Sequence, residues 1–299
     1  MVRAKTLLRY LLGWSLVEMM GSNGDLCVSD GFAEVLSANG IDSLDALFRF
    51  RNDESLSKPG LSRWRERLRL VLMGGERVFY LKRFSNPPRS ARREIMRSRT
   101  GARSVAGVEW AWMRQLRADG IPCPEPVAFG EELDVRGEIR SAVLMAEVPG
   151  ASLERRASQW TAADRSSFVP MLLPLADLVS RFHAEGYIHR DLYLCHVFHD
   201  ATVPPSQGLC LIDLQRVIKP SAFYRRWRVK DLAALNYSTP EGLVTRADRI
   251  RWLARYLGVT KLDEAARRLV FSIAGKTRSI ARHDRRRRAG WRKKAGRSA

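Results

Sequence analysis

The stretch from Gly186 to Phe198, which reads G-Y-I-H-R-D-L-Y-L-C-H-V-F, constrains this chain more than any other. A helical apolar pattern ends at Gly186, and a polar turn with an aspartate, Asp191, follows it. Twenty-two residues after Asp191, the strand-like run L-C-L-I-D-L holds a second aspartate, Asp213. The triplet H-R-D alone also suits a solvated turn after a helix. The later strand with its own carboxylate favours a functional pair of aspartates.

Two carboxylates in this order are typical of phosphoryl transfer. The first accepts a proton from the attacking hydroxyl, and the second holds a magnesium ion that neutralises phosphate charge. We therefore take Asp191, with His189 and Arg190, as candidate catalytic residues and Asp213 as the candidate metal ligand. Where the protein-kinase pattern has Asn, this chain has His196. Because imidazole is a poor Mg²⁺ ligand, His196 is expected to donate to a nucleotide phosphate, to orient Asp191, or to accompany a single metal ion.

Three segments carry a family resemblance: H-R-D-L-Y-L-C-H, L-I-D-L-Q-R, and R-R-W-R-V-K-D-L from Arg225 to Leu232. They closely resemble the bacterial lipopolysaccharide core heptose kinase family of the WaaP type, with the related Kdo kinases, over residues 48–238. The resemblance implies a protein-kinase-like fold, ATP and Mg²⁺ as cofactors, and a heptose or Kdo of the lipopolysaccharide inner core as acceptor. It also implies that Asp231 braces the catalytic-loop backbone while the nearby arginines face a phosphorylated acceptor. A solvated basic helix start is the alternative for that last segment.

A lysine and a glutamate are expected to meet in the amino-terminal half. Alternation in V-F-Y-L-K-R-F, residues 78–84, places Lys82 on a mainly apolar strand face, where its ammonium group can bind the α- and β-phosphates. The helix predicted from Ser104 to Arg117 has an apolar stripe that includes Glu109, and an inward carboxylate needs a partner. We therefore predict a Lys82–Glu109 ion pair. Glu94 is the competing partner, and a snorkelling edge lysine is the alternative for Lys82.

Two further parts of a nucleotide site are marked by weaker patterns. The run A-V-L-M-A-E-V-P-G, residues 142–150, ends in a turn and is typical of a hinge whose backbone at Glu147 and Val148 binds an adenine edge. The stretch from Asn52 to Trp64 should cover the phosphates. It lacks G-x-G-x-x-G and offers Gly60 with three serines, so backbone amides of a polar loop would bind the phosphates.

These elements together predict an α+β fold with two lobes, like that of protein kinases. We expect a small β-rich lobe over residues 48–147 and a mainly helical lobe with the catalytic loop over residues 148–275. Residues 1–47 are expected to form a helical extension, and residues 276–299 a basic, disordered tail. The predicted strands of the small lobe include Leu47–Arg51, Leu68–Met73 and Val78–Phe84.

The charge of the chain calls for a polyanionic partner. The 299 residues include 52 Lys and Arg against 32 Asp and Glu, a formal net charge of +20. Between Lys276 and Arg297, eleven basic residues and one acidic residue, Asp284, give 11 − 1 = +10. We expect this segment, with Trp291 as its aromatic anchor, to bind an anionic membrane surface. The expected location is therefore cytoplasmic and peripheral to the inner membrane. A solubilising tail or a nonspecific RNA-binding tail is the alternative that composition leaves open.

Cysteine usage and hydropathy agree with that location. The chain has no C-x-x-C pair, which disfavours a zinc site and suits a reducing compartment. No apolar run approaches the eighteen or so residues that a membrane-spanning helix needs. The four cysteines are Cys27, Cys123, Cys195 and Cys210.

Two alternatives stay open. The first is a kinase of the same fold that acts on a protein, an aminoglycoside or another small molecule, because the loop motifs do not select an acceptor. The second is a nucleic-acid or membrane binding protein with a degenerate kinase fold, suggested by the net charge and the missing glycine-rich loop. The joint presence of the two aspartates and the Lys82–Glu109 pair favours an enzyme.

Overall fold

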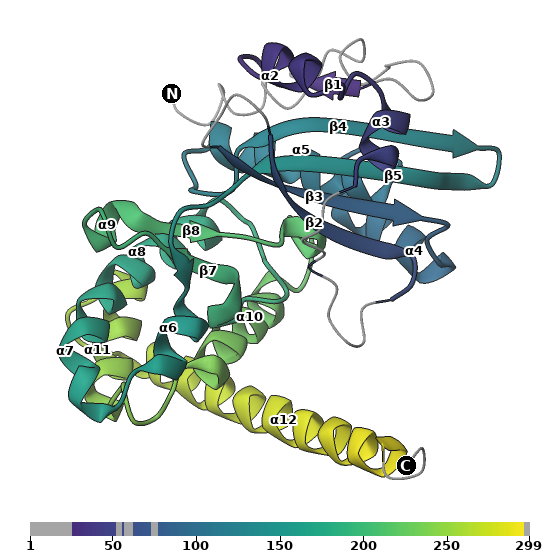
Figure 1. The fold of residues 1–299 in the computed structure, drawn as a ribbon. Coiled ribbons are helices and arrows are strands. Elements are labelled where there is room, and N and C mark those ends of the chain that lie inside the picture. The colour runs from purple at the N-terminus through teal and green to yellow at the C-terminus, as the bar shows by residue number, and fades with distance from the viewer. Residues whose placement is uncertain (1–25, 52–55, 57–61, 73–76, 296–299) are drawn as a thin grey trace, which may run out of the picture. The chain divides into compact units, whose positions relative to one another are not determined.

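The structure, a computed structural model, consists of two compact units (Figure 1). The first unit comprises the chain up to Arg114 together with Glu125–Glu147, and the second comprises Gln115–Pro124 and the chain from Val148 onward. A sheet forms the centre of the first unit, and helices make up most of the second, in agreement with the predicted α+β fold. The residues that the structure describes are 26–51, 56, 62–72 and 77–295.

The first unit is built on a five-stranded antiparallel sheet with the strand order β1-β4-β5-β3-β2. Strands β3 and β5 are central, and Lys82 on β3 lies opposite Val143 on β5. The strands are β1 (Leu26–Val28), β2 (Arg65–Val71), β3 (Val78–Ser85), β4 (Pro126–Asp134) and β5 (Gly137–Ala146). The helices are α2 (Ala33–Ala38), α3 (Leu44–Arg49), α4 (Arg89–Ser98) and α5 (Val105–Ala118).

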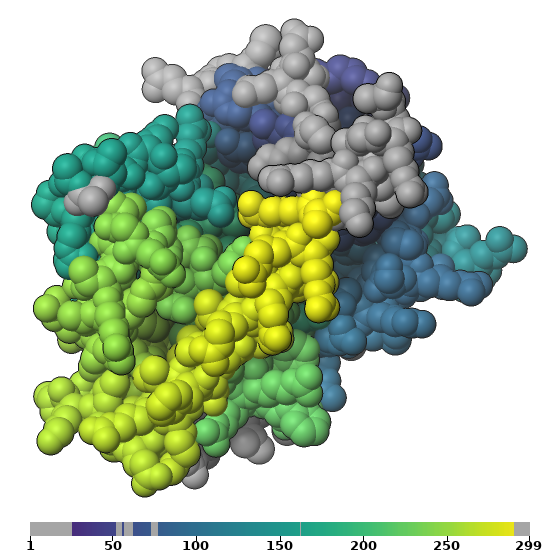
Figure 2. All heavy atoms as spheres, turned by 90° about the horizontal axis from the view of Figure 1, so that it is seen from below, coloured from purple at the N-terminus to yellow at the C-terminus, as the bar shows by residue number. Residues whose placement is uncertain are grey.

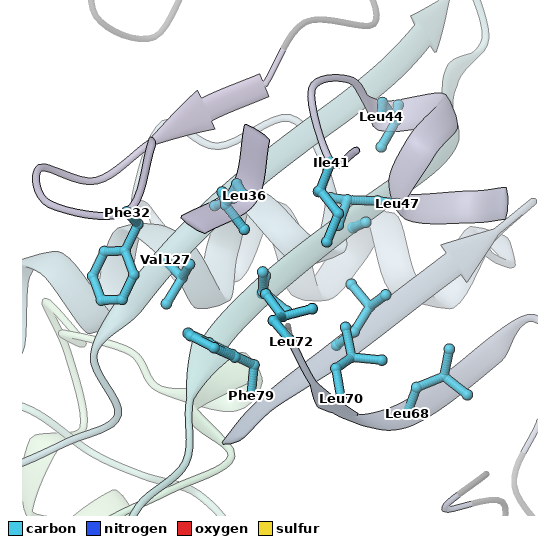
Figure 3. Close-up of a cluster of buried hydrophobic side chains, with 14 residues drawn as sticks. Phe32, Leu36, Ile41, Leu44, Leu47, Leu68, Leu70, Leu72, Phe79 and Val127 are labelled. Carbon is cyan, nitrogen blue, oxygen red and sulfur yellow. The ribbon is translucent and has the colours of Figure 1, made fainter. Parts of the chain in front are cut away.

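One face of this sheet packs against α2 and α3. Figure 3 shows the side chains of Phe32, Leu36 and Leu47 from the helical segment directed toward those of Leu70 and Phe79 from β2 and β3. Burying a large apolar side chain of this kind is worth roughly 1.5–3 kcal/mol, so the cluster fixes the inward face of β3. Because side chains alternate along a strand, Tyr80 and Lys82 then face the other side of the sheet.

The structure corrects two expectations about the amino-terminal region. The predicted strand Leu47–Arg51 is wrong, because Leu44–Arg49 is helix α3, capped by the Ser43 hydroxyl that accepts from the Ala46 amide at 3.2 Å. The separation of residues 1–47 from the β-rich lobe is also wrong for its described part, since β1 pairs with β4 in the same sheet. Residues 1–25 lie outside the described part of the chain.

The second unit combines helices with a three-stranded sheet of order β6-β7-β8. Helix α8 buries Leu175, Val179 and Phe182 on one face and ends before Gly186, where the helical pattern is expected to end and whose φ of +83° lies in the left-handed region common after helices. Its helices and 3₁₀ turns are α6 (Leu153–Gln159), η1 (Ala162–Asp164), α7 (Arg165–Phe168), η2 (Val169–Met171), α8 (Leu172–Ala184), η3 (Leu194–His196), α9 (Pro205–Gly208), η4 (Leu214–Arg216), α10 (Tyr224–Ser238), α11 (Arg246–Leu257) and α12 (Glu264–Ala295). Its strands are β6 (Ala151–Ser152), β7 (Val197–His199) and β8 (Leu209–Leu211).

Helix α12 replaces the disordered tail that composition suggests. It continues without interruption from Glu264 to Ala295 and packs against α10. The Asn236 amide donates to Thr277 at 3.1 Å and the Tyr237 hydroxyl donates to Asp284 at 2.8 Å, so polar contacts attach the arginine-rich part to the fold. Figure 2 shows this helix, in yellow, on the surface of the second unit.

No helix within residues 26–51, 62–72 and 77–295 is both long enough and apolar enough to cross a membrane.

Candidate active site

The catalytic loop is held by one buried carboxylate. Asp231 of α10 has no exposed surface and accepts from the His189 amide at 2.7 Å and from the Arg190 amide at 2.8 Å. A buried carboxylate with two amide donors is well satisfied, and removing it would leave two buried amides unpaired. The prediction that Asp231 braces the catalytic-loop backbone is therefore confirmed.

Arg190 turns the chain so that the next side chain, Asp191, leaves the core. Its φ of +69° lies in the left-handed region, which costs a non-glycine residue about 1 kcal/mol or more and persists only where neighbours hold it. The Asp231 contact holds the Arg190 amide, and the Lys230 ammonium donates to the Arg190 carbonyl at 2.7 Å. The guanidinium lies over the Trp227 ring, 5.5 Å from its centroid. These contacts indicate that Arg190 positions Asp191.

His189 links the catalytic loop to the strand before Asp213. Its ring is fully buried, and Nε2 lies 3.0 Å from the carbonyl oxygen of Ile212, so Nε2 carries the hydrogen and donates. Burial first, and the nearby charge of His196 second, lower the pKa of His189, so this ring is neutral at neutral pH. The stacked ring of His196 lies 5.7 Å away between centroids. A catalytic part for His189 stays a prediction.

His196 lies between the two candidate aspartates. Its Nδ1 is 2.7 Å from the backbone oxygen of Asp191, and its Nε2 is 3.6 Å from Oδ2 of Asp213. Because a carbonyl oxygen only accepts, Nδ1 must be the protonated nitrogen, and Nε2 is then directed toward a carboxylate. Of the three expected parts for His196, this geometry favours orienting Asp191. Binding to nucleotide phosphate stays a prediction.

Asp213 offers a carboxylate suited to a magnesium ion. It follows β8 at a φ of +59°, and the Ile212 amide just before it donates to the His196 carbonyl at 3.0 Å, which fixes its position. About a quarter of the Asp213 side chain is exposed. Mg²⁺ takes one or two carboxylates and completes its shell with phosphates and water. One accessible carboxylate fits this requirement, although the described residues contain no cluster of three or more metal-ligating side chains.

Asp191 has a partner that sequence reasoning missed. Arg216, at the end of η4, places Nη1 2.7 Å from Oδ2 and 3.0 Å from Oδ1 of Asp191. The signal was present in the motif L-I-D-L-Q-R, where Arg216 stands three residues after Asp213. A carboxylate oxygen has two acceptor sites, so this contact leaves room for a hydroxyl to donate to Asp191.

The first unit contains the predicted ion pair. Nζ of Lys82 lies 2.6 Å from Oε1 of Glu109, with 11% and 1% of their side chains exposed. Glu94, the competing partner, instead contacts Arg97 on its own helix at 2.6 Å. The contact expected between Lys82 and Glu109 is present, and their binding of a nucleotide stays a prediction.

Helix α5 carries Glu109 to Lys82 because its first turn is tied to β5. The Glu138 carboxylate accepts from the Val105 amide at 2.9 Å, and the Ser141 hydroxyl accepts from the Ala106 amide at 3.2 Å. These two contacts satisfy amides at the amino end of α5, which have no partner inside the helix. Burial raises the pKa of Glu138 to about 7, since the charged form loses water there.

The candidate hinge is partly committed to the sheet. The Glu147 amide donates to the Val78 carbonyl at 2.9 Å, and the Glu147 carboxylate accepts from the Tyr80 hydroxyl at 3.1 Å. The Glu147 amide is therefore unavailable to an adenine edge, which leaves its carbonyl and the backbone of Val148 for the predicted contact. Most of the predicted phosphate-covering stretch, residues 52–55 and 57–61, lies outside the described residues.

An antiparallel sheet with a buried Lys–Glu pair, followed by a helical unit with a braced H-R-D loop and a later aspartate, defines the protein-kinase-like class of fold. The chain belongs to the lipopolysaccharide kinase (Kdo/WaaP) family, whose sequence profile matches residues 77–256, more than half of its length. The expected family and fold are thereby confirmed.

Relatives with known names agree with this membership. The chain is 32% identical over 154 residues to the lipopolysaccharide core heptose(I) kinase WaaP of Pseudomonas aeruginosa, which covers 50% of the chain and 58% of that protein. It is 30% identical over 162 residues to the protein of the same name from Escherichia coli, which covers 52% of the chain and 61% of the relative. The matches thus span about three fifths of these curated relatives.

A solved structure described as WaaP in complex with acyl carrier protein resembles most of this chain. It matches with a TM-score of 0.62 and 26% identity over 87% of this chain and 98% of that one.

Proposed function

We propose that this protein is an ATP-dependent kinase that phosphorylates a sugar hydroxyl, on heptose or Kdo, in the inner core of lipopolysaccharide. The observation that carries the proposal is the braced loop, in which Asp231 holds the His189 and Arg190 amides and leaves the Asp191 carboxylate accessible. Family membership and the named relatives support the lipopolysaccharide acceptor.

In the proposed step, the acceptor hydroxyl oxygen forms a bond to the γ-phosphorus of ATP while the bond from that phosphorus to the β–γ bridging oxygen breaks. ADP leaves with the electron pair of the broken bond, and the hydroxyl proton passes to Asp191. Phosphoryl transfer of this kind needs positioning and charge neutralisation more than covalent help. Arg190 and His196 position Asp191, and Lys82, held by Glu109, is proposed to bind the nucleotide phosphates.

Magnesium is the proposed metal, with Asp213 as its protein ligand. When bound, the ion would neutralise phosphate charge during transfer. The backbone next to Asp213 is held by the hydrogen bond from the Ile212 amide to the His196 carbonyl.

The direct test is phosphate transfer from radiolabelled ATP to lipopolysaccharide that lacks inner-core phosphate. Acceptor with heptose, acceptor that ends in Kdo, and a protein mixture should be compared in parallel. We expect label on a glycolipid in the presence of Mg²⁺ and none with Asp213→Asn. Label on protein, or no ATP turnover with any acceptor, would contradict this proposal and favour one of the two alternatives.

The proposal includes partners on the cytoplasmic side of the membrane. The exposed arginines of α12 support binding to an anionic inner-membrane surface, where a lipid-linked acceptor lies. The solved relative contains an acyl carrier protein, and we include such a protein as a candidate partner of this chain. Co-purification with tagged acyl carrier protein in low salt tests this, and its absence in both the acylated and unacylated states would remove that partner.

A further inference from the structure

The guanidinium of Arg216 is engaged on one side only. Its Nη1 binds both oxygens of Asp191, at 2.7 and 3.0 Å. Its Nε and Nη2 make no hydrogen bond to any residue within the described part of the chain, and 45% of the side chain is exposed. Because a guanidinium has five N–H donors in a rigid fork, Arg216 can hold Asp191 and bind an anion at the same time.

A second cation lies in the same place. Lys230 of α10 donates to the Arg190 carbonyl at 2.7 Å, and its ammonium interacts electrostatically with Asp191 and Arg216. The ammonium nitrogen of Lys230 also lies over the Trp227 ring, 5.9 Å from its centroid. An ammonium has three donors, so one backbone contact leaves Lys230 able to donate further.

The local charges leave an excess of cations around Asp191. Of the other carboxylates near the loop, Asp231 is fully buried and already accepts from two backbone amides, and Asp213 lies on the His196 side. Arg216 pairs with the Asp191 carboxylate, whereas the Lys230 ammonium contacts the neighbouring Arg190 carbonyl, so burial and the charge of the other cation make each one costly to hold there. An anion placed between them would offset this repulsion.

We propose that Arg216 and Lys230 form a phosphate-binding subsite beside Asp191, an inference that rests on the proposed kinase function. A planar donor fork and a compact ammonium together suit the several oxygens of a phosphate group. Two groups have this chemistry: the γ-phosphate of the nucleotide, and a phosphate already carried by the acceptor. Either would lie beside Asp191, so Arg216 would orient the base and bind the anion in one contact.

The test compares Arg216→Gln, Arg216→Lys and Lys230→Gln with matched controls. Arg246→Gln and Lys261→Gln remove exposed cations elsewhere in the second unit and should leave every measured value unchanged. Affinity for ATP and for ADP is measured on the full chain with Mg²⁺ and without acceptor. The KM and kcat are then measured with a phosphorylated acceptor and with the same acceptor after phosphatase treatment.

If the γ-phosphate occupies the subsite, the two Gln variants lose roughly 10- to 100-fold of affinity for ATP with ADP affinity unchanged. If an acceptor phosphate occupies it, ATP affinity stays constant and the KM for phosphorylated acceptor rises by that factor, while the KM for the treated acceptor does not change. Arg216→Lys, which keeps the charge but loses the fork, should restore part of either loss.

The proposal would be overturned if, in both Gln variants, the affinity for ATP relative to ADP and the KM for phosphorylated acceptor were unchanged. A fall in kcat alone would mean that Arg216 only positions Asp191, and would overturn it equally. Thermal unfolding of each variant identifies those that fail to fold, and Lys230→Gln then stands in for Arg216→Gln. Because ATP and ADP binding need no acceptor, the nucleotide measurements are informative even if the proposed lipopolysaccharide activity fails.

Discussion

Asp191 and Asp213 have different surroundings and different proposed parts. We therefore predict that substitution by Asn affects activity differently at the two positions. Asp191 is the proton acceptor, so Asp191→Asn should lower kcat by about 10²- to 10⁴-fold while ATP affinity changes less than about twofold. Asp213→Asn should abolish transfer and the Mg²⁺ dependence of ATP binding. Asp177→Asn, which removes an exposed partner of Arg255 in the same unit, is the control. Near-normal kcat in either variant would remove that residue from its proposed part.

His196 has two contacts that one substitution can separate. An Asn amide is able to donate to the Asp191 carbonyl as Nδ1 now does, but it has no counterpart of Nε2, which lies 3.6 Å from Asp213. We therefore expect His196→Asn to reduce kcat by roughly tenfold and to change the Mg²⁺ concentration for half activity, and His196→Ala to reduce kcat further. Titration of activity with Mg²⁺ measures both effects. A fully active Asn variant with unchanged Mg²⁺ dependence would make His196 a packing residue.

At the scale of single elements, the Lys82–Glu109 pair joins β3 to α5. Breaking a buried ion pair leaves one charge uncompensated, which costs about 3 kcal/mol or more. Lys82→Met and Glu109→Gln should each weaken ATP binding and activity, and the double variant should lose little more than either single one. Glu94→Gln, which removes an exposed contact on α4, is the matched control. Additive losses would show that the two residues act independently.

The anchor of α5 predicts a pH dependence of stability in the first unit. Burial raises the pKa of Glu138 from its usual value to about 7. Between the unfolded and folded pKa values the folded state binds more protons than the unfolded state, so stability falls as pH rises toward 7 and then levels off. A shift of this size corresponds to roughly 3 kcal/mol.

Glu138→Gln stays neutral and should lose this dependence. Urea unfolding of wild type and variant at pH 4.5 and pH 8 measures the difference, with Glu34→Gln on exposed α2 as the control. Wild type should lose about 3 kcal/mol more than the Gln variant over this interval. Equal losses in the two proteins would mean that folding does not raise the pKa of Glu138.

At the scale of the whole molecule, contacts are predicted correctly from the sequence where the chemistry of a residue and the periodicity around it point to the same placement. Lys82 and Glu109 were each the charged member of an apolar face, so their contact followed from two independent patterns. Asp231 followed from the family resemblance, since nothing in the periodicity of α10 shows that it faces the catalytic loop. Arg216 was missed because its contact with Asp191 depends on the left-handed backbone at both Arg190 and Asp213, which no local pattern predicts.

The prediction from composition is wrong for the carboxy-terminal segment, because a few specific contacts decide its structure. The segment after Lys276 has the charge of a disordered chain, yet Thr277, Ile280 and Asp284 recur at helical spacing and lie on the less exposed side of α12. Asp284 accepts from Tyr237 of α10 and pairs with Arg288 at 2.7 Å, so the single acidic residue anchors the helix. Trp291 lies in the same helix, but its side chain is outside the described part of the structure.

The last prediction concerns the outer side of α12, whose exposed arginines 278, 282, 285 and 286 we call the basic face. These positions recur at intervals of three and four residues, so they lie along one side of the helix away from the Asp284 anchor. We expect the basic face to bind anionic membrane, at roughly 1 kcal/mol for each arginine close to the surface. Charge neutralisation is a sharper test than truncation, because truncation would also remove the contacts with α10.

Changing all four residues of the basic face to Gln should abolish binding to vesicles of anionic phospholipid and raise the KM for a lipid-linked acceptor. The KM for a soluble sugar acceptor and the affinity for ATP should stay constant, since neither depends on a surface. In the wild type, raising the salt concentration should release the vesicles, because exposed charges are screened beyond about 8 Å at physiological ionic strength. The control is the pair Arg246→Gln and Lys261→Gln. If the variant with all four substitutions still bound vesicles, the basic face would not be the membrane-binding surface. If that variant lost binding to RNA and kept binding to vesicles, the basic face would be assigned to RNA.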